Sequence, residues 1–369
     1  MITLVLVVRA MRKQLLPFCV LWGLWTSSPR SIVLAQPLSR EISSVPACAR
    51  CTLHGSRVLT LGTESDSGLL GAPPLSVVRD ARGAWWVSVH RTGEPIHVFD
   101  ALGRLQRTIG ARGGGPGEFV GPLMLSRSTT DTMYIYDSGA SRITALHSGG
   151  GPMVHRPSAI SGIEQFAVSG DGRIVVNASV TSVDAAGLPL HLLDAKTGLP
   201  SRSFGAVEAV YRHDFPRVLS RRVIFADDDH LWSVLPTRYV LERWNIRTAR
   251  VEASLTRRSD SFKPHWLPEI VAPNPSTAPA PYIIGSGLDP SGRIWVYSLM
   301  PDPNWRRALG PKRLMGGREI YPVTDIDRYY DTLVEIIDPA SGRLVASHRV
   351  DPALTAVAAY DHAAGMDHS

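Results

Sequence analysis

Residues 80–87 read DARGAWWV, a tight turn of Asp80 and Gly83 followed by a strand of aromatic and β-branched residues. The same unit returns four times, at 130–136 (TDTMYIY), 170–176 (GDGRIVV), 227–234 (DDDHLWSV) and 289–296 (DPSGRIWV). Self-similarity along a chain is the signature of a repeat architecture. The composition fits one, because 44% hydrophobic and 20% charged residues exclude a disordered chain, and 32 Gly and 28 Pro suit a turn-rich β protein.

A second hairpin pattern follows each of these units. It is clearest over 96–110, and its counterparts run over 143–156, 190–205, 241–256 and 334–350. Two hairpins make four antiparallel strands, and repeated four-stranded units stack radially into a β-propeller, which buries both faces of each small sheet. An ordinary β-sandwich would not need one turn and strand five times in the same phase. The sequence therefore predicts an all-β propeller.

Two segments resemble a known repeat. Residues 134–143 (YIYDSGASRI) end a strand in Asp137 and turn through small residues to an arginine, as the core of an NHL repeat does. Residues 99–119 (FDALGRLQRTIGARGGGPGEF) resemble the junction between two NHL blades. From about residue 50 to 350 the chain looks like exported bacterial six-bladed β-propeller proteins of NHL type. The resemblance implies a fold and says almost nothing about activity.

The repeats fall short of six. Five are complete, over 75–110, 122–156, 163–205, 217–256 and 282–350. The resemblance implies an abbreviated sixth blade, closed by an N-terminal strand at 52–62 beside a C-terminal segment at 353–360. An unpaired edge left by such a blade could instead pair with another chain. We expect the propeller domain to span 51–360, with a flexible tail at 361–369.

Residues 1–35 have the pattern of a signal peptide. Arg9, Arg12 and Lys13 precede an apolar stretch over 15–25, and Val33 and Ala35 are the small residues that signal peptidase accepts before Gln36. An uncleaved membrane anchor is the alternative. After cleavage no stable membrane span is expected, and the product would be exported, as a periplasmic or secreted protein. Loss of the four bases in this segment lowers the formal charge from +6 to +2, so charge predicts no nucleic-acid partner.

The expected mature chain keeps two cysteines, Cys48 and Cys51, at the end of an N-terminal linker over 36–50. In an oxidising compartment the simplest reading is one structural disulfide. A haem site would need His where Thr52 stands, and a zinc site would need more ligands than His54 adds. A thioredoxin-like motif lacks its strand-to-helix context, and two free thiols remain open.

The lengths of the connections are expected to differ between the two faces of the propeller. With strands a to d running outward from the axis, the a–b and c–d turns share one face and the b–c and d–a connections share the other. The first set is uniformly short, which defines a tight-turn face. The second set holds the insertions at 111–121, 178–188, 206–216, 257–281 and 299–332, which defines a long-loop face. Binding residues gather on variable loops held by a rigid scaffold, so we expect the functional site on the long-loop face.

The loop over 299–332 carries the densest positive charge. Basic residues there could receive a carboxylate, a phosphate or an acidic polysaccharide, with Tyr297 and Trp305 as stacking surfaces. A solvated loop balanced by its own acids is the alternative. The ligand-binding candidates on and around the long-loop face are His90, Arg91, Asp137, Arg238, Tyr297, Trp305, Arg306, Arg307, Lys312 and Arg313.

Catalytic signatures are missing from the sequence. There is no Gly-x-Ser-x-Gly elbow and no His-Glu-x-x-His motif. The leading hypothesis is a binding scaffold without a cofactor, whose partner is a protein, a saccharide or a small anionic ligand. The alternative is a hydrolase or lyase, of the lactonase kind, that holds Ca²⁺ or Zn²⁺ near the axis. His90, Asp137 and Asn177 stand at matching strand ends and are the weak candidates for metal ligands.

Overall fold

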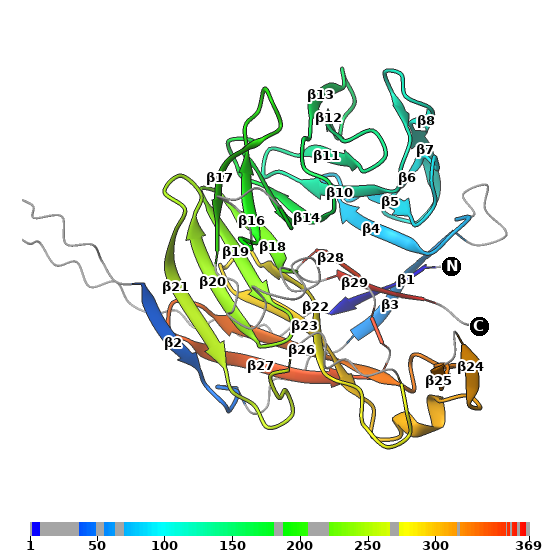
Figure 1. Cartoon of the computed structure of the whole chain (residues 1–369), viewed down its shortest axis with the longest axis vertical. Helices are drawn as coiled ribbons and strands as arrows, with labels where there is room; N and C mark the ends of the chain where they lie inside the picture. The colour runs from blue at the N-terminus through cyan, green and yellow to red at the C-terminus, as the bar shows by residue number, and fades with distance from the viewer. Residues whose placement is uncertain are drawn as a thin grey trace, which may run out of the picture.

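Small antiparallel sheets follow one another around a central axis (Figure 1). The computed structural model describes residues 2–7, 37–48, 55–62, 70–180, 187–205, 221–265, 273–315, 318–351, 353–354, 356–359 and 362–366. In this part of the chain nearly all regular structure is β-strand, and no helix is long and apolar enough to cross a bilayer. The predicted all-β propeller is confirmed.

Five sheets each contain a blade of four strands, in chain order with the innermost strand first. The first blade is β4 (Pro74–Arg79), β5 (Trp85–Val89), β6 (Ile96–Phe99) and β7 (Leu105–Ile109). The second is β10 (Leu123–Arg127), β11 (Thr132–Asp137), β12 (Arg142–His147) and β13 (Val154–Pro157). The third is β14 (Ile163–Val168), β15 (Ile174–Ala178), β16 (Leu190–Leu193) and β17 (Pro200–Phe204). The fourth is β18 (Val223–Asp227), β19 (His230–Leu235), β20 (Val240–Asn245) and β21 (Arg250–Arg257). The fifth is β22 (Tyr282–Leu288), β23 (Ile294–Pro301), β26 (Tyr330–Asp338) and β27 (Arg343–Val350).

The structure has five blades, not the six that the resemblance implies, and the five complete repeats match them. Between the fifth blade and the first lies a further sheet, whose strand β28 is next to both β22 and β4. In the order β28-β29-β1-β3, its strands are β28 (Ala356–Ala359), β29 (His362–Met366), β1 (Ile2–Val7) and β3 (Gly55–Leu61).

Only half of this sheet has the expected make-up. Strand β3 falls in the predicted N-terminal strand and β28 in the predicted C-terminal segment. Strands β29 and β1 instead lie in the stretches expected to be a flexible tail and a cleaved leader. The run ITLVLV of β1 has high strand propensity, so it can supply pairing that the abbreviated last repeat lacks.

The position of a strand within its blade decides its burial. Every residue of β5 and β15 is buried, because these second strands lie between two neighbouring blades. In the outermost strands β7 and β17 only the last residue is buried, and the others are exposed or half-buried. One apolar cluster joins the first two blades through Trp86, Phe119 and Ile135, and another joins the fourth and fifth through Leu241, Leu255 and Ile337.

The turns of the repeat explain why its aspartate and tryptophan recur. Asp80 accepts hydrogen bonds from the amides of Arg82 (3.0 Å) and Ala84 (2.9 Å), and its other oxygen accepts one from the indole of Trp86 (3.1 Å). Asp289 repeats this arrangement with Trp295, whose indole nitrogen is 3.2 Å away. The carboxylate therefore fixes the turn and orients the tryptophan at the second position of the following strand.

Residues 38–48 form a strap across the outside of two blades. Strand β2 (Leu38–Ile42) pairs in parallel with β21, and it lies beside β21 and β27 in Figure 1. The chain then reaches β27, where the amide of Ser43 donates to Gly342 (3.0 Å) and that of Ala47 to Leu344 (2.7 Å). Cys48 is disulfide-bonded, but its predicted partner Cys51 lies outside the described residues, so the pairing stays a prediction.

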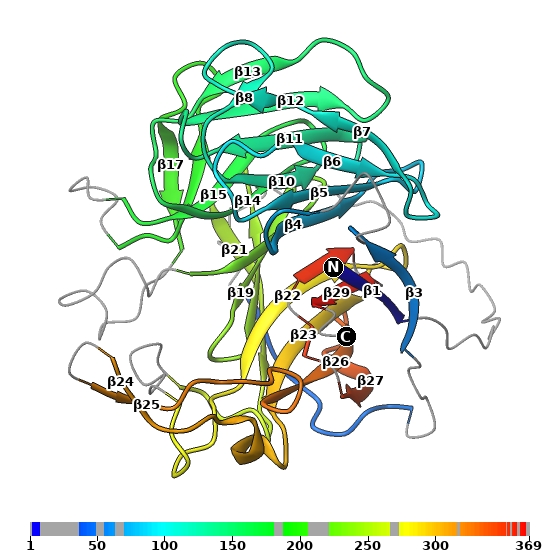
Figure 2. The same ribbon diagram turned by 90° about the vertical axis from the view of Figure 1, so that its right-hand side faces the viewer.

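The two faces of the propeller differ as predicted. Strand order places the β15–β16, β17–β18, β21–β22 and β23–β26 connections on one face, and these are the long insertions. The insertion between β23 and β26 contains a 3₁₀ turn, η3 (Trp305–Ala308), and a hairpin of β24 (Arg313–Met315) and β25 (Arg318–Ile320). That hairpin stands away from the blades in Figure 2. A short parallel pair, β8 (Ala111–Arg112) with β9 (Glu118–Phe119), lies in the β7–β10 connection on the same face.

Candidate functional site

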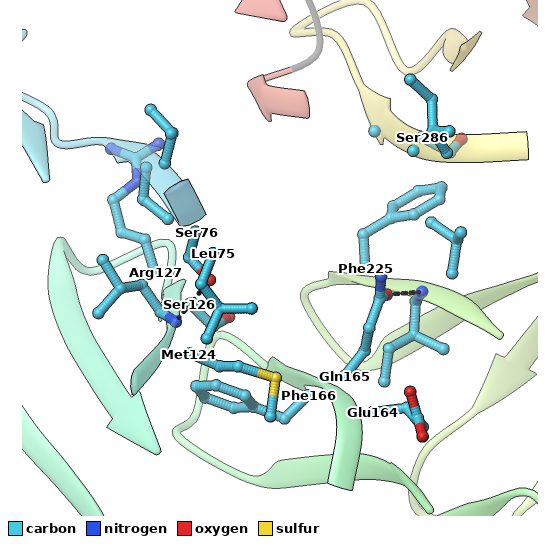
Figure 3. A pocket seen from close by; sticks show the side chains of 18 of the residues that line it. Leu75, Ser76, Met124, Ser126, Arg127, Glu164, Gln165, Phe166, Phe225 and Ser286 are labelled. Carbon is cyan, nitrogen blue, oxygen red and sulfur yellow. Dashed lines mark hydrogen bonds between the residues drawn. The ribbon is translucent and has the colours of Figure 1, made fainter. Parts of the chain in front are cut away.

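A cavity of about 480 Å³ lies on the axis, lined by the innermost strands β4, β10, β14, β18 and β22 (Figure 3). Its apolar lining includes Met124, Phe166 and Phe225, and its polar lining includes Ser126 and Ser286. Figure 3 shows Met124 next to Phe166, with Phe225 between them and Ser286. A site of this volume and mixed lining fits a small molecule.

Three of the five lining strands carry an irregularity at one equivalent place. The register with the second strand shifts between Pro74 and Ser76 in β4, between Ile163 and Gln165 in β14, and between Ile283 and Gly285 in β22. The extra residues are Leu75, Glu164 and Ile284, and all three line the cavity.

These irregularities lie near the start of each strand, on the side of the long-loop face. A β-bulge re-aims a side chain and bends its strand, and bulges are over-represented beside active sites. The first, third and fifth blades thus contribute one acidic and two aliphatic side chains to the same level of the axial cavity.

Hydrogen bonds between blades hold the cavity wall. The amide of Leu125 donates to the Ser76 hydroxyl (3.2 Å), and the amide of Ile224 donates to the Gln165 side-chain carbonyl (3.0 Å), as Figure 3 marks. Each bond joins the innermost strand of one blade to that of the next. Because the wall is braced in this way, the cavity is formed before any ligand arrives.

Two opposite charges face the same end of the cavity. Glu164 and Arg221 are both exposed, and both line it. The Arg221 guanidinium carbon lies 5.8 Å from the centre of the Tyr282 ring. Burial raises the pKa of Tyr282, with the Arg221 charge opposing that rise and the Glu164 charge adding to it. Both charges therefore act on one phenol at the rim.

The predicted metal ligands are not brought together. Asp137 is fully buried and accepts the amides of Val120 (3.0 Å), Gly121 (2.8 Å), Gly139 (3.0 Å) and Ala140 (3.1 Å). It therefore fixes the junction between the first and second blades, which is the structural role of that turn position.

Asn177 is likewise occupied. Its amide donates to the Pro189 carbonyl (2.8 Å), and its oxygen accepts the Arg222 amide (2.9 Å). His90 is exposed in the connection that follows β5. Among the described residues, no group of three or more His, Cys, Asp or Glu side chains could hold a metal ion.

The aromatic residues chosen as stacking surfaces are enclosed. Tyr297 is fully buried in the fifth blade, and Trp305 is 4% exposed. The ring of Trp305 meets Tyr329 edge-on, with centroids 6.3 Å apart, and Arg306 covers it at 4.6 Å. Contrary to the expectation, neither residue offers an open face to a ligand.

The basic residues of the long insertion differ in availability. Arg306 donates to the Pro275 carbonyl (2.8 Å), and Lys312 forms an ion pair with Glu319. Arg307 and Arg313 are exposed.

The two remaining basic candidates lie in other blades. Exposed Arg91 pairs with Glu94 (3.2 Å). Half-buried Arg238 lines a different cavity, at the outer part of the fourth blade.

Sequence reasoning missed the axial cavity. Its residues stand just before the Asp/Gly turns, on or next to the first strand of each repeat. They mix core types such as Phe166 with charged types such as Glu164 and Arg221, so no motif marks them. The usable signal is positional: once a propeller is predicted, the strand before each recurrent turn is the one that lines the axis.

Comparisons with known proteins find distant structural similarity alone. No protein-family model matches the sequence, and no curated protein matches it. A DUF4221-family member from Bacteroides vulgatus has a TM-score of 0.49 at 11% identity, covering 77% of this chain and 84% of that one. A candidate exported protein from Bacteroides fragilis has a TM-score of 0.47 at 11% identity, covering 86% and 80%. Virginiamycin B lyase from Staphylococcus aureus has a TM-score of 0.40 at 10% identity, covering 79% and 94%. Similarity at this level is no guide to what the chain binds.

Proposed function

We propose that this protein is an exported, NHL-like β-propeller that binds a small ligand at its axis, through the long-loop face. The observation that supports this best is the set of three bulges at one level of the cavity, Leu75, Glu164 and Ile284. A bulge weakens strand pairing locally, so three at equivalent positions favour a binding role over a purely structural one.

The lining suggests the kind of ligand. Met124, Phe166 and Phe225 would take an apolar body, and the exposed charges of Glu164 and Arg221 would meet polar or ionic groups at the rim. The exposed cations Arg307 and Arg313 on the long insertion between β23 and β26 would attract an anionic ligand, such as an acidic saccharide. His90, Arg91 and Arg238 belong to the same face and remain candidates for a larger partner.

Export is part of the same proposal. The leader pattern before Gln36 supports cleavage, and the disulfide-bonded Cys48 suits an oxidising compartment. In the mature chain we expect Cys48 to pair with Cys51. The strap strand β2 begins at Leu38, two residues after Gln36, so cleavage there would leave the strap intact. The same cleavage would remove β1 from its place between β29 and β3.

A pair of matched variants tests the site. Ser286→Phe fills the axial cavity, and Ser291→Phe places the same side chain on an exposed turn of the tight-turn face. Thermal unfolding of the wild-type protein is first screened against a library of small polar and anionic metabolites. We expect a compound that raises Tm for the wild type and Ser291→Phe but not for Ser286→Phe. A ligand that stabilises Ser286→Phe as well would contradict an axial site.

A further inference from the structure

A second cavity, of about 920 Å³, lies away from the axis, where the strap meets the fourth blade. We call it the rim groove. It is bounded by Ser44 of the strap, by Arg238 in the turn between β19 and β20, and by the chain over 256–264 at the end of β21. All three segments end on the long-loop face, so the groove opens there.

A buried ion pair forms the floor of the rim groove. Arg257, which is 6% exposed, pairs with Glu335 of the fifth blade (3.1 Å), and Glu335 also accepts the Tyr239 hydroxyl (2.7 Å). Arg257 further donates to the Ser44 carbonyl (3.4 Å). Its Nε is buried and has no hydrogen-bond partner among the described residues, so the floor keeps an unused donor.

The wall of the rim groove is anchored on both sides. Phe262 is 1% exposed and meets the Tyr239 ring edge-on, with centroids 5.2 Å apart. His265 donates from its backbone to Thr237 (3.1 Å) and from its ring to Pro281 (2.7 Å). The loop between them is thereby held in place, which lowers the entropy cost of binding there.

The charged side chains that line the groove are mainly positive. Arg238, Arg258 and Lys263 line it, and Asp260 is the acidic residue among the lining side chains. The buried charge of Arg257 is already matched by Glu335. Arg258 lies 3.9 Å from Glu41, but both side chains are exposed, so that pair contributes little and can exchange for a ligand.

Hydroxyl groups stand between these cations. Ser44, Ser259 and Ser261 line the same groove, and the last two hydroxyls are 2.8 Å apart. Since one of that pair donates to the other, a hydroxyl hydrogen stays available. Cations and hydroxyls converging on one concavity are the donor set that phosphate, sulfate and carboxylate oxygens accept.

We propose that the rim groove binds an oxyanion, with Arg258 and Lys263 as its main charged contacts and Arg238 behind them. This site does not depend on the axial cavity, because it lies at the outer edge of the fourth blade, on different strands. The bound group is a phosphate, a sulfate or a carboxylate of a small molecule.

Calorimetric titration of the full-length protein tests the groove. Inorganic phosphate and acetate are titrated separately at constant ionic strength, with chloride as the balancing anion. Arg258→Ala/Lys263→Ala removes two of the contacts, and Arg250→Ala removes an exposed arginine at the opposite end of β21 as the matched control. Circular dichroism confirms that each variant is folded.

We expect saturable binding of at least one of the two anions to the wild type and to Arg250→Ala. Each charge-assisted contact contributes enough that the double variant should bind about tenfold more weakly or worse. Binding of phosphate alone would assign a tetrahedral oxyanion, and binding of acetate would assign a carboxylate. Absence of saturable heat with both anions, or equal affinity in the double variant, would overturn the proposal whether or not the axial cavity binds a ligand.

Discussion

Single carboxylates hold neighbouring repeats together in this molecule. Asp137 is the clearest, because four backbone amides from two segments converge on it. These are charge-assisted bonds in a fully buried place, where an unmatched donor is costly. The same residue type that suggests a metal ligand in the sequence is here the fixed point of a blade junction.

Replacing Asp137 tests that role. Asp137→Asn turns one acceptor oxygen into a donor that faces backbone N–H groups, so we expect a loss of about 2–3 kcal/mol in the free energy of unfolding. Urea denaturation measures it. Asp194→Asn is the control, since Asp194 caps an exposed turn through the amides of Lys196 and Thr197 and should lose much less. A loss below about 1 kcal/mol at Asp137 would be evidence against a structural role.

His191 gives a pH dependence of known sign. It is fully buried, with one ring nitrogen 2.7 Å from the Ser203 hydroxyl and the other 3.1 Å from the Ala178 carbonyl. Burial lowers the pKa of His191 below its ordinary value. The folded protein therefore binds fewer protons than the unfolded chain, and the stability this histidine gives is complete above about pH 6.5. It is lost as the pH falls from there through the folded-state pKa.

An NMR titration of the histidine ring signals checks this directly, and we expect the His191 midpoint below 6.5. In urea denaturation, His191→Asn should lose less stability than the wild type between pH 7.5 and 5.5. The stability of this variant should still fall somewhat with pH, because burial also lowers the pKa of His97. A midpoint at or above 6.5 would refute the argument.

At the scale of elements, local contacts separate what the sequence predicted from what it did not. The Asp80 and Asp289 turns bind tryptophans six residues further along the chain. Because these contacts are local, the repeat and its hairpins could be predicted from the sequence. The bulges at Leu75, Glu164 and Ile284 depend on how a strand pairs with its neighbour, and no residue pattern marks them. The burial of Trp305 could not be predicted from the sequence either, because its ring packs against Tyr329, which lies in a distant part of the same insertion.

The strap contributes stability through one side chain above all. Ile42 is 1% exposed and packs with the cluster that joins the fourth and fifth blades, whereas Leu38 at the other end of β2 is 48% exposed. We expect Ile42→Ala to lower the free energy of unfolding by about 3 kcal/mol, through lost burial and the cavity left behind. Leu38→Ala should change it by about 0.5 kcal/mol or less.

Thermal and urea unfolding of the two variants, compared with the wild type, measure the contribution of the strap. If Ile42→Ala and Leu38→Ala were equally mild, β2 would be a loosely held addition to the blade rather than part of its packing.

On the scale of the whole molecule, the ring was predictable, and its closure was predictable only for strands β3 and β28. Five complete repeats predict five blades, because each repeat contains the two hairpins of its own blade. The remaining sheet takes strands from both ends of the chain, and its pairings Ile2↔Leu61 and Ile2↔Met366 depend on which segments happen to meet. The axial cavity belongs to this scale as well, since five different repeats each supply a part of its wall.

The pairing of the strap also constrains the order in which the protein can fold. Leu38 pairs with Ala253, so strand β2, which is synthesised early, can pair only after its partner strand has been synthesised 215 residues later. Contacts between such distant segments form late and slow a fold down. In a chain that leaves the ribosome or a translocation pore from its N-terminus, strand β2 of the strap would emerge early and dock among the last. The outer seam of the fourth and fifth blades would therefore close only after most of the polypeptide had been delivered.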